Sequence, residues 1–103
     1  MKELNEDNLA DIVKDNKKVL VQYGATWCGN CRMIKPKFKR LAGETEGVVF
    51  VYADAEKYPE SRKLANVSNL PTFASFVDGK LINEEAGSKG QLLTRMIDEI
   101  TNH

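Results

Sequence analysis

Both cysteines of the chain lie in one short stretch, residues 26–32 (TWCGNCR), where only two residues separate them. An apolar run at residues 19–23 comes before this stretch, and a helical pattern of apolar residues at 34–41 follows it. A Cys-x-x-Cys pair between a strand and a helix is typical of a thiol–disulfide redox site. The spacing therefore predicts a dithiol that cycles between two thiols and one disulfide.

Disulfide exchange needs a thiolate, because the anion and not the thiol is the nucleophile. Cys28 is predicted to lie where the following helix begins, so unpaired N–H groups and the helix dipole would lower the pKa of its thiol. Cys31 follows three residues later, close enough to form a disulfide with it. We therefore expect Cys28 to be the exposed attacking thiol and Cys31 the more buried resolving thiol.

Two other interpretations of the cysteine pair remain. The two residues could be inert core residues, or they could be two ligands of a metal. A structural zinc site usually needs four ligands, whereas this chain has no second cysteine pair and one histidine, His103 at its end. A zinc site within one chain is therefore disfavoured, and a cluster shared between two chains is formally open. We expect no metal and no bound cofactor.

Apolar periodicity predicts the elements that position the pair, in the order β-α-β-α-β-α-β-β-α. Strands are expected at residues 2–4, 19–23, 48–53, 72–77 and 80–85, the last two joined by a tight turn at Asp78-Gly79. Helices are expected after an N-cap at Asn5, from Cys28 to a stop at Gly43, at 59–66, and after an N-cap at Ser88. The predicted fold class is α/β, with a mixed sheet of four to five strands flanked by helices on both faces.

Length and composition limit what the chain can be. Its 103 residues are close to the commonest domain size, which predicts a single domain over 1–103. Lys and Arg together number 15, as do Asp and Glu, so nothing favours nucleic acid or an anionic membrane as a partner. The N-terminus lacks the apolar core of a signal peptide, and two cysteines suit a reducing compartment. We expect a cytoplasmic protein, and a monomer because no surplus apolar face is evident.

The motifs taken together resemble the thioredoxin family. Trp-Cys-Gly-x-Cys is followed by Met33-Ile34 and Pro36, then by Leu-Pro-Thr-Phe at 70–73, Asp-Gly-Lys at 78–80, and Gly87 with the segment 88–92. They come in the family's order over nearly the whole chain. The resemblance implies the thioredoxin fold and protein-disulfide reductase activity, in which Cys28 attacks a disulfide of a target protein and Cys31 resolves the mixed disulfide. It also implies renewal by a thioredoxin reductase.

The resemblance also implies roles for the neighbours of the cysteines. Trp27 would be a flat apolar wall that shields the mixed disulfide and meets the target. Gly29 would let the backbone turn tightly beside the thiol and keep its approach clear. Asn30 stands where the best-known thioredoxin motif has proline. Its backbone N–H, which proline lacks, could stabilise the Cys28 thiolate and make the protein a weaker reductant, unless loop relaxation cancels the effect.

Three further residues are expected beside the cysteines. The resemblance implies a cis peptide bond between Leu70 and Pro71, packed against the disulfide. That arrangement would leave the backbone of Leu70 free to pair with an extended target segment. Gly87 is expected to let another loop approach the cysteines closely. The predicted substrate-binding residues are therefore Trp27, Leu70, Pro71 and Gly87.

Two positions depart from the family's pattern. Many thioredoxins have a buried aspartate where this chain has Gln22, and a lysine on the next strand where it has Phe50. Gln22 cannot accept a proton near neutral pH, although its amide can donate a hydrogen bond or hold a water. As the one polar residue in an apolar strand, Gln22 needs a partner. We expect Cys31 to be activated by solvent or by Cys28 rather than by a carboxylate.

Two alternative functions stay open on the sequence. The chain could be a thioredoxin-fold binding or chaperone module, which the loss of the buried acid favours, or a more oxidising disulfide oxidase or isomerase, which Asn30 favours. The helix after the cysteines also carries five cations, which predict a solvated face or a dock for an acidic partner such as a reductase. They are Arg32, Lys35, Lys37, Lys39 and Arg40.

Overall fold

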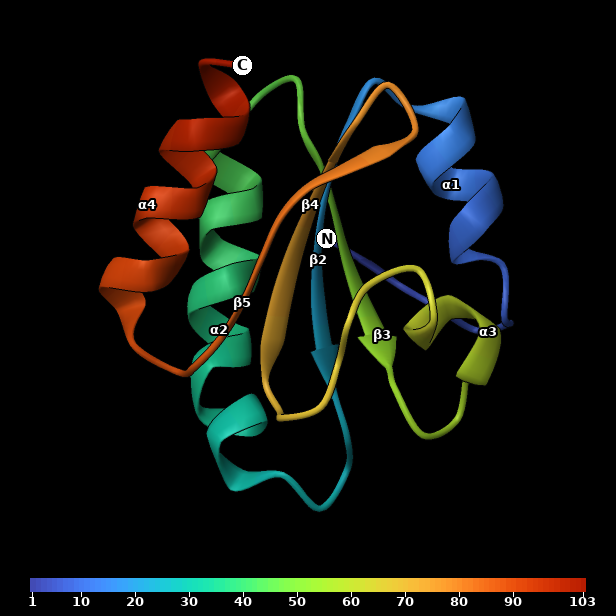
Figure 1. Cartoon of the computed structure of the whole chain (residues 1–103). Helices are drawn as coiled ribbons and strands as arrows, with labels where there is room; N and C mark the ends of the chain where they lie inside the picture. Colours follow the sequence, from blue (N-terminus) through green and yellow to red (C-terminus); the bar gives the residue numbers. More distant parts are fainter.

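The computed structural model describes all residues, 1–103, as a five-stranded sheet between two layers of helices (Figure 1). The strands are β1 (Lys2–Glu3), β2 (Lys18–Gly24), β3 (Val49–Asp54), β4 (Thr72–Val77) and β5 (Lys80–Ala86). The helices are α1 (Leu9–Asp15), α2 (Gly29–Glu44), α3 (Pro59–Arg62) and α4 (Gly90–Thr101). The predicted element order and the predicted mixed sheet are both confirmed.

The central strand β2 leads directly into the cysteine stretch. The strand order is β1-β3-β2-β4-β5, and β2 pairs parallel with β3 and antiparallel with β4. β4 and β5 form the predicted hairpin, in whose turn Asp78 and Gly79 have φ angles of 52° and 82°. Positive φ at both positions is what a two-residue hairpin turn of type I′ requires. Because β2 is hydrogen-bonded on both sides, its C-terminal end is a fixed point from which the site loop starts.

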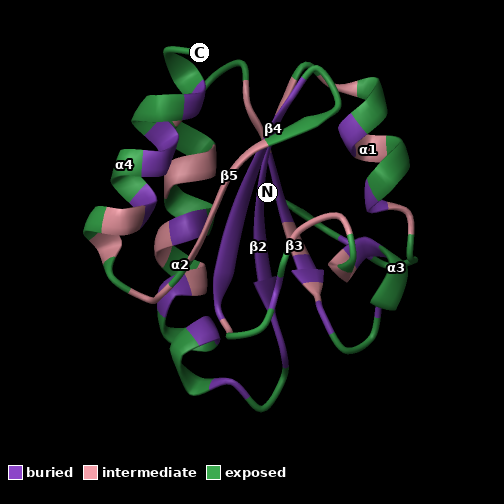
Figure 2. Cartoon of the chain, viewed as in Figure 1, coloured by how far each residue is buried: buried purple, intermediate pink, exposed green.

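Helices cover both faces of the sheet, α1 and α3 on one side and α2 and α4 on the other (Figure 1). The central strands between these layers are buried (Figure 2). Side chains alternate along β2, as the pleat of a strand requires: Val19, Val21 and Tyr23 pack into the core beside α1, whereas Leu20 packs with Phe38 of α2. Both cores therefore hold the strand that positions the cysteines.

The two predicted helix N-caps are wrong. α1 has Asn8 and not Asn5 at its cap position, and α4 has Lys89 and not Ser88. Neither cap residue makes a side-chain capping bond. In α4 a contact between distant residues explains the difference. The N–H of Gly87 donates to the carbonyl of Pro71 at 2.9 Å, and the helix begins only after this hydrogen bond.

Two predicted helix ends also differ from the structure. α2 continues through Gly43 to Glu44, because Gly43 does not adopt the positive φ that makes glycine a helix stop. α3 ends at Arg62 rather than at residue 66. The guanidinium of Arg62 instead donates to the carbonyl of Val67 at 2.8 and 3.1 Å, which folds the following loop back on the helix. No helix has both the length and the apolar character required to cross a bilayer.

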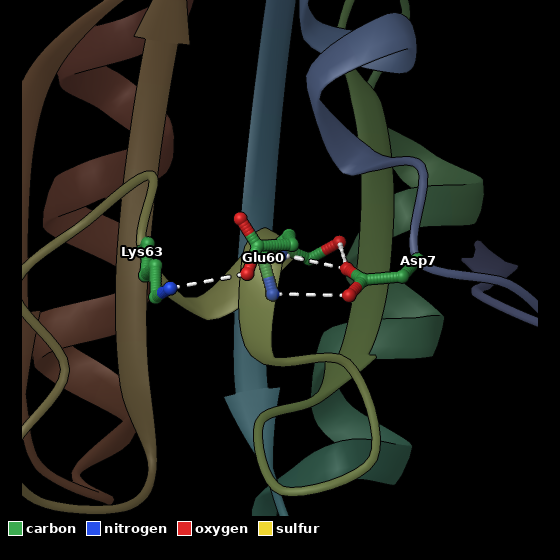
Figure 3. Close-up of polar contacts among 4 residues, drawn as sticks. Asp7, Glu60 and Lys63 are labelled. Carbon is green, nitrogen blue, oxygen red and sulfur yellow. Dashed lines mark hydrogen bonds and ion pairs between the residues drawn. The ribbon is translucent and has the colours of Figure 1, made fainter.

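The carboxylate of Asp7 joins the N-terminal loop to α3 (Figure 3). Its Oδ2 accepts from the N–H of Glu60 at 3.0 Å, and its Oδ1 accepts from the N–H and the hydroxyl of Ser61 at 2.7 and 2.6 Å. Ser61 Oγ accepts in turn from the N–H of Leu9 at 3.2 Å. These bonds, above all the one from the Ser61 hydroxyl, hold the pKa of Asp7 below its ordinary value.

Candidate active site at the start of α2

The two cysteines form a disulfide at the first turn of α2. Cys28 is the N-cap residue and Cys31 lies inside the helix, with 5.3 Å between their Cα atoms. Cys28 Sγ accepts a hydrogen bond from the N–H of Cys31 at 3.1 Å. Cys28 is 5% exposed and Cys31 is fully buried. The predicted position at the helix start is confirmed, and Cys28 is the more accessible of the two sulfurs.

The backbone holds Cys28 from both sides. Its N–H donates to the carbonyl of Ala25 at 3.2 Å, and its own carbonyl accepts from the N–H of Arg32 at 3.2 Å. Ala25, Cys28 and Cys31 are packed together, with Leu70 against them. The sulfur therefore has an apolar setting on one side and the N–H groups of a helix start on the other. When the disulfide is reduced, the N–H groups favour a thiolate at Cys28, and the apolar packing opposes it.

The neighbours of Cys28 in the motif contribute exposed side chains, a backbone donor and open space. The Trp27 side chain is 64% exposed, and Asn30 is also exposed. The backbone donor that reaches Cys28 Sγ is the N–H of Cys31, whereas the sequence suggested that of Asn30. Gly29 has no positive φ, so a tight turn is not the reason for glycine there; a Cβ at this position would meet nothing within 4 Å.

The exposure of one apolar residue in α2, two positions after Cys31, was not predicted from the sequence. Met33 is 64% exposed, as much as Trp27, although it lies in the first half of α2. The available signal was its place outside the apolar stripe formed by Ile34, Phe38 and Leu41, which leaves an apolar side chain on the solvent side. Unbranched and polarizable, a methionine adapts to irregular partner surfaces.

The Leu70–Pro71 peptide bond is cis, as the resemblance implied. The carbonyl of Pro71 accepts from the N–H of Gly87 at 2.9 Å, so Gly87 approaches the proline. The φ of Gly87 is 144°, a conformation that favours glycine, and a Cβ there would lie 3.2 Å from Leu92. The structure thus joins Pro71 to Gly87, and places Leu70 against the cysteines.

Gln22 lies beneath the disulfide, fully buried on β2. Its Nε2 donates to the carbonyl of Cys31 at 3.1 Å, so the expected hydrogen-bond partner is present. Its Oε1 has no protein partner. Phe50 is not the neighbour of Gln22 in the sheet: it pairs with Leu20 and packs on Phe38, with ring centroids 5.1 Å apart. Because neither Gln22 nor Phe50 carries a charge, no unpaired ion is buried at these positions.

The arrangement of Cys28 and Cys31 is suited to two-electron exchange between a dithiol and a disulfide. Cys28, expected to be exposed, is in fact buried with 5% of its surface accessible, and its sulfur accepts a helix N–H; Cys31 is fully buried and bonded to it. No group of three or more His, Cys, Asp or Glu side chains is gathered in a way that could hold a metal ion. The fold and this dithiol together define a class, the thiol–disulfide oxidoreductases.

Comparison with known sequences identifies the family. The Thioredoxin family pattern matches residues 1–99. Thioredoxin-2 of Pyricularia oryzae is 34% identical over 99 residues, which cover 96% of this chain and 57% of that protein. Thioredoxin of Mycobacterium tuberculosis is 34% identical over 95 residues, covering 89% of this chain and 82% of the relative.

Solved structures agree with the sequence comparison. Mitochondrial thioredoxin 3 from Saccharomyces cerevisiae, in its oxidised form, superimposes with a TM-score of 0.87 at 30% identity, covering 96% of this chain and 94% of that one. Plasmodium falciparum thioredoxin superimposes with a TM-score of 0.90 at 24% identity, covering 96% and 98%, and shows the likeness of fold. The chain belongs to the thioredoxin family. With its Cys28–Cys31 pair it is a thiol–disulfide oxidoreductase of the protein-disulfide reductase type.

Proposed function

We propose that this chain reduces disulfide bonds in target proteins and is itself renewed by a thioredoxin reductase. The observation that carries the proposal is the Cys28–Cys31 disulfide at the start of α2, with the N–H of Cys31 donated to Cys28 Sγ. In the reduced protein the same N–H and the helix dipole favour the thiolate at Cys28. A thiolate held in this way is ready to attack a disulfide bond of a target protein.

The reaction balances with these two sulfurs alone. The Cys28 thiolate attacks one sulfur of the target disulfide, that S–S bond breaks, and one target thiolate leaves. Cys31 then loses its proton to solvent and attacks Cys28 Sγ, which expels the second target thiolate and closes the Cys28–Cys31 bond. Two electrons pass from the dithiol to the target, and the reductase returns two electrons and two protons.

The target would be held by the residues that surround Cys28. Trp27, the residue before Cys28, offers an exposed apolar surface. Leu70 packs against the cysteines, and Pro71 is joined to Gly87. The proposed target segment is extended and pairs with the backbone of Leu70, because the cis proline that follows has no N–H to compete for it.

Gln22, Gly29 and Asn30 are proposed to tune the exchange. Gln22 holds the Cys31 carbonyl but cannot take the proton of the Cys31 thiol, which leaves solvent as the acceptor. The absence of a side chain at Gly29, which has open space around it, keeps the approach to Cys28 clear. Asn30 is the second of the two residues between the cysteines, and it keeps a backbone N–H that proline would lack at this position.

We further propose one domain over residues 1–103, acting as a monomer in the cytoplasm. One sheet serves both cores, which supports a single folding unit. The presence of only two cysteines, both in the redox motif, supports a reducing compartment. One relative is named a mitochondrial thioredoxin, so cell fractionation is the test that decides between the two compartments. Sedimentation at several concentrations tests the monomer.

Single cysteine variants test the proposed reaction. Cys31→Ser should trap a covalent mixed disulfide with a disulfide-bonded target, because nothing remains to resolve it, whereas Cys28→Ser should form none. Adducts are counted by mass spectrometry under non-reducing conditions, with the double variant as control. A Cys28→Ser adduct equal to that of Cys31→Ser would overturn the assigned roles. Retained cellular function in the double variant would instead identify a binding module.

The reduction potential tests the direction of the reaction. Thioredoxins lie near about −270 mV, whereas isomerases lie near about −180 mV and strong oxidases near about −120 mV. Equilibration with a glutathione buffer, followed by alkylation of the free thiols, measures the Cys28–Cys31 couple. We expect a value close to that of thioredoxins. A value at or above that of the isomerases would assign the chain to disulfide formation or isomerisation.

A further inference from the structure

A pocket adjoins the loop that carries the active-site cysteine. It has a volume of about 450 Å³ and is open to solvent between the C-terminal ends of β2 and β3 and the first turns of α2. Ala25 and Thr26 form its wall on the side of the active site, and Ala25 also packs against the disulfide. Any segment that passes Cys28 on that side therefore comes within reach of the pocket.

A glycine at the end of β2 makes room for Tyr52, which lines the pocket. A Cβ at Gly24 would overlap the hydroxyl of Tyr52, so the tyrosine occupies the space that a side chain at position 24 would need. Lys35 lies over the Tyr52 ring, 4.1 Å from its centroid, and is ion-paired with Glu3. Burial, followed by the carboxylates of Asp54 and Glu3, raises the pKa of Tyr52, so its hydroxyl keeps its proton.

Of the two carboxylates that line the pocket, Glu3 is ion-paired with Lys35, whereas Asp54 has no cation as partner and its Oδ1 accepts the N–H groups of Glu56 and Lys57 at 3.0 Å each. The cations that line the pocket, Arg32, Lys35 and Lys57, outnumber the carboxylates. The guanidinium of Arg32 has no ion pair or hydrogen bond. The ammonium of Lys57 has no ion pair and lies 5.7 Å from the Tyr58 ring centroid. The Tyr52 hydroxyl also makes no hydrogen bond.

We infer that this pocket binds an acidic side chain, Asp or Glu, that lies next to the disulfide of the target protein. A guanidinium, an ammonium and a protonated hydroxyl, all unused, are the groups that a carboxylate requires. The Arg32 guanidinium follows Cys28 by one helical turn, so the acidic residue would enter as its disulfide meets Cys28. This inference rests on the proposed function and adds a preference among its targets.

Paired disulfide peptides test the inference. One peptide carries Glu beside its cysteine and the other carries Gln, and kcat/KM for reduction is measured with catalytic amounts of the protein and an excess of a small dithiol. We expect about a threefold preference for the Glu peptide, the size of an exposed ion pair. The preference should shrink as ionic strength rises from about 0.01 to 1 M, because salt screens exposed charges.

Matched variants test whether Arg32 and Lys57 cause the preference for the Glu peptide. In Arg32→Gln/Lys57→Gln the ratio of the two rates should fall to about one. Arg40→Gln, which removes a cation of the same helix outside the pocket, should keep the ratio and the rate of the parent. Equal rates for both peptides in the parent, or a ratio that survives in the double variant, would overturn the inference while leaving the reductase function intact. If neither peptide were reduced, the proposed function would fail with it.

Discussion

Replacing Gln22 by aspartate places an ionisable group beneath the disulfide. Gln22 is fully buried, and its only hydrogen bond goes to the Cys31 carbonyl. Burial raises the pKa of a carboxyl group, by about 3 units or more at a fully buried site, so the folded pKa would be about 7 rather than about 4. At that value the carboxylate could accept the proton of the Cys31 thiol near neutral pH, which the amide of Gln22 cannot.

The same pKa shift makes the Gln22→Asp variant less stable as pH rises. Because the folded pKa lies above the unfolded pKa, the unfolded state loses its proton first, and the folded state is penalised as pH rises. A shift of about 3 units lowers the free energy of unfolding by about 4 kcal/mol above about pH 7, and by nothing below about pH 4. Domains of this kind have about 5–15 kcal/mol to lose, so Gln22→Asp should still fold.

Two measurements on one pair of variants check this reasoning. Gln22→Asn is the control, because it matches aspartate in size but does not titrate. Denaturant unfolding between about pH 4 and pH 8 should show the slope in Gln22→Asp alone. Stopped-flow fluorescence of Trp27, the only tryptophan, should show that Gln22→Asp releases the mixed disulfide faster above its pKa. Identical release rates for the two variants over about pH 5 to 8 would refute a role for any base at this position.

Three further predictions concern stability and redox tuning. Phe38→Ala should lower the free energy of unfolding by about 3–5 kcal/mol in denaturant titrations, because the ring is fully buried against two other aromatic rings; a loss below about 1 kcal/mol would contradict that packing. Asp7→Asn should destabilise the protein at neutral pH. Since the folded pKa of Asp7 is lowered, the difference between variant and parent should disappear as pH falls below about 4, and a difference that persists in acid would point to packing instead. Asn30→Pro should lower the reduction potential by less than about 30 mV, the equivalent of about 1.4 kcal/mol, because the N–H of Cys31 already serves Cys28 Sγ; an unchanged or higher potential would exclude a contribution from Asn30.

Much of the fold was predictable because its signals are local. The apolar run of β2 indicated a strand covered on both faces, and Asp78-Gly79 indicated a hairpin turn. Helix caps were predicted poorly for the opposite reason. Asn5 and Ser88 are good cap residues by type, but contacts made by distant residues decide where α1 and α4 begin. Asp7 caps α3 across 53 positions of sequence, and no local pattern reveals such a pairing.

The sequence by itself determined the chemistry. Two cysteines separated by two residues, at the junction of a buried strand and a helix, place the first sulfur at the helix start, and local geometry suffices for that. The tertiary structure alone decided what surrounds the sulfur. It made the N–H of Cys31 the donor to Cys28 Sγ, bonded the N–H of Gly87 to the carbonyl of Pro71, and packed Tyr52 against Gly24 beside the pocket. Each of those contacts depends on how strands and loops far apart in the chain come together, which a residue's neighbours in sequence do not specify.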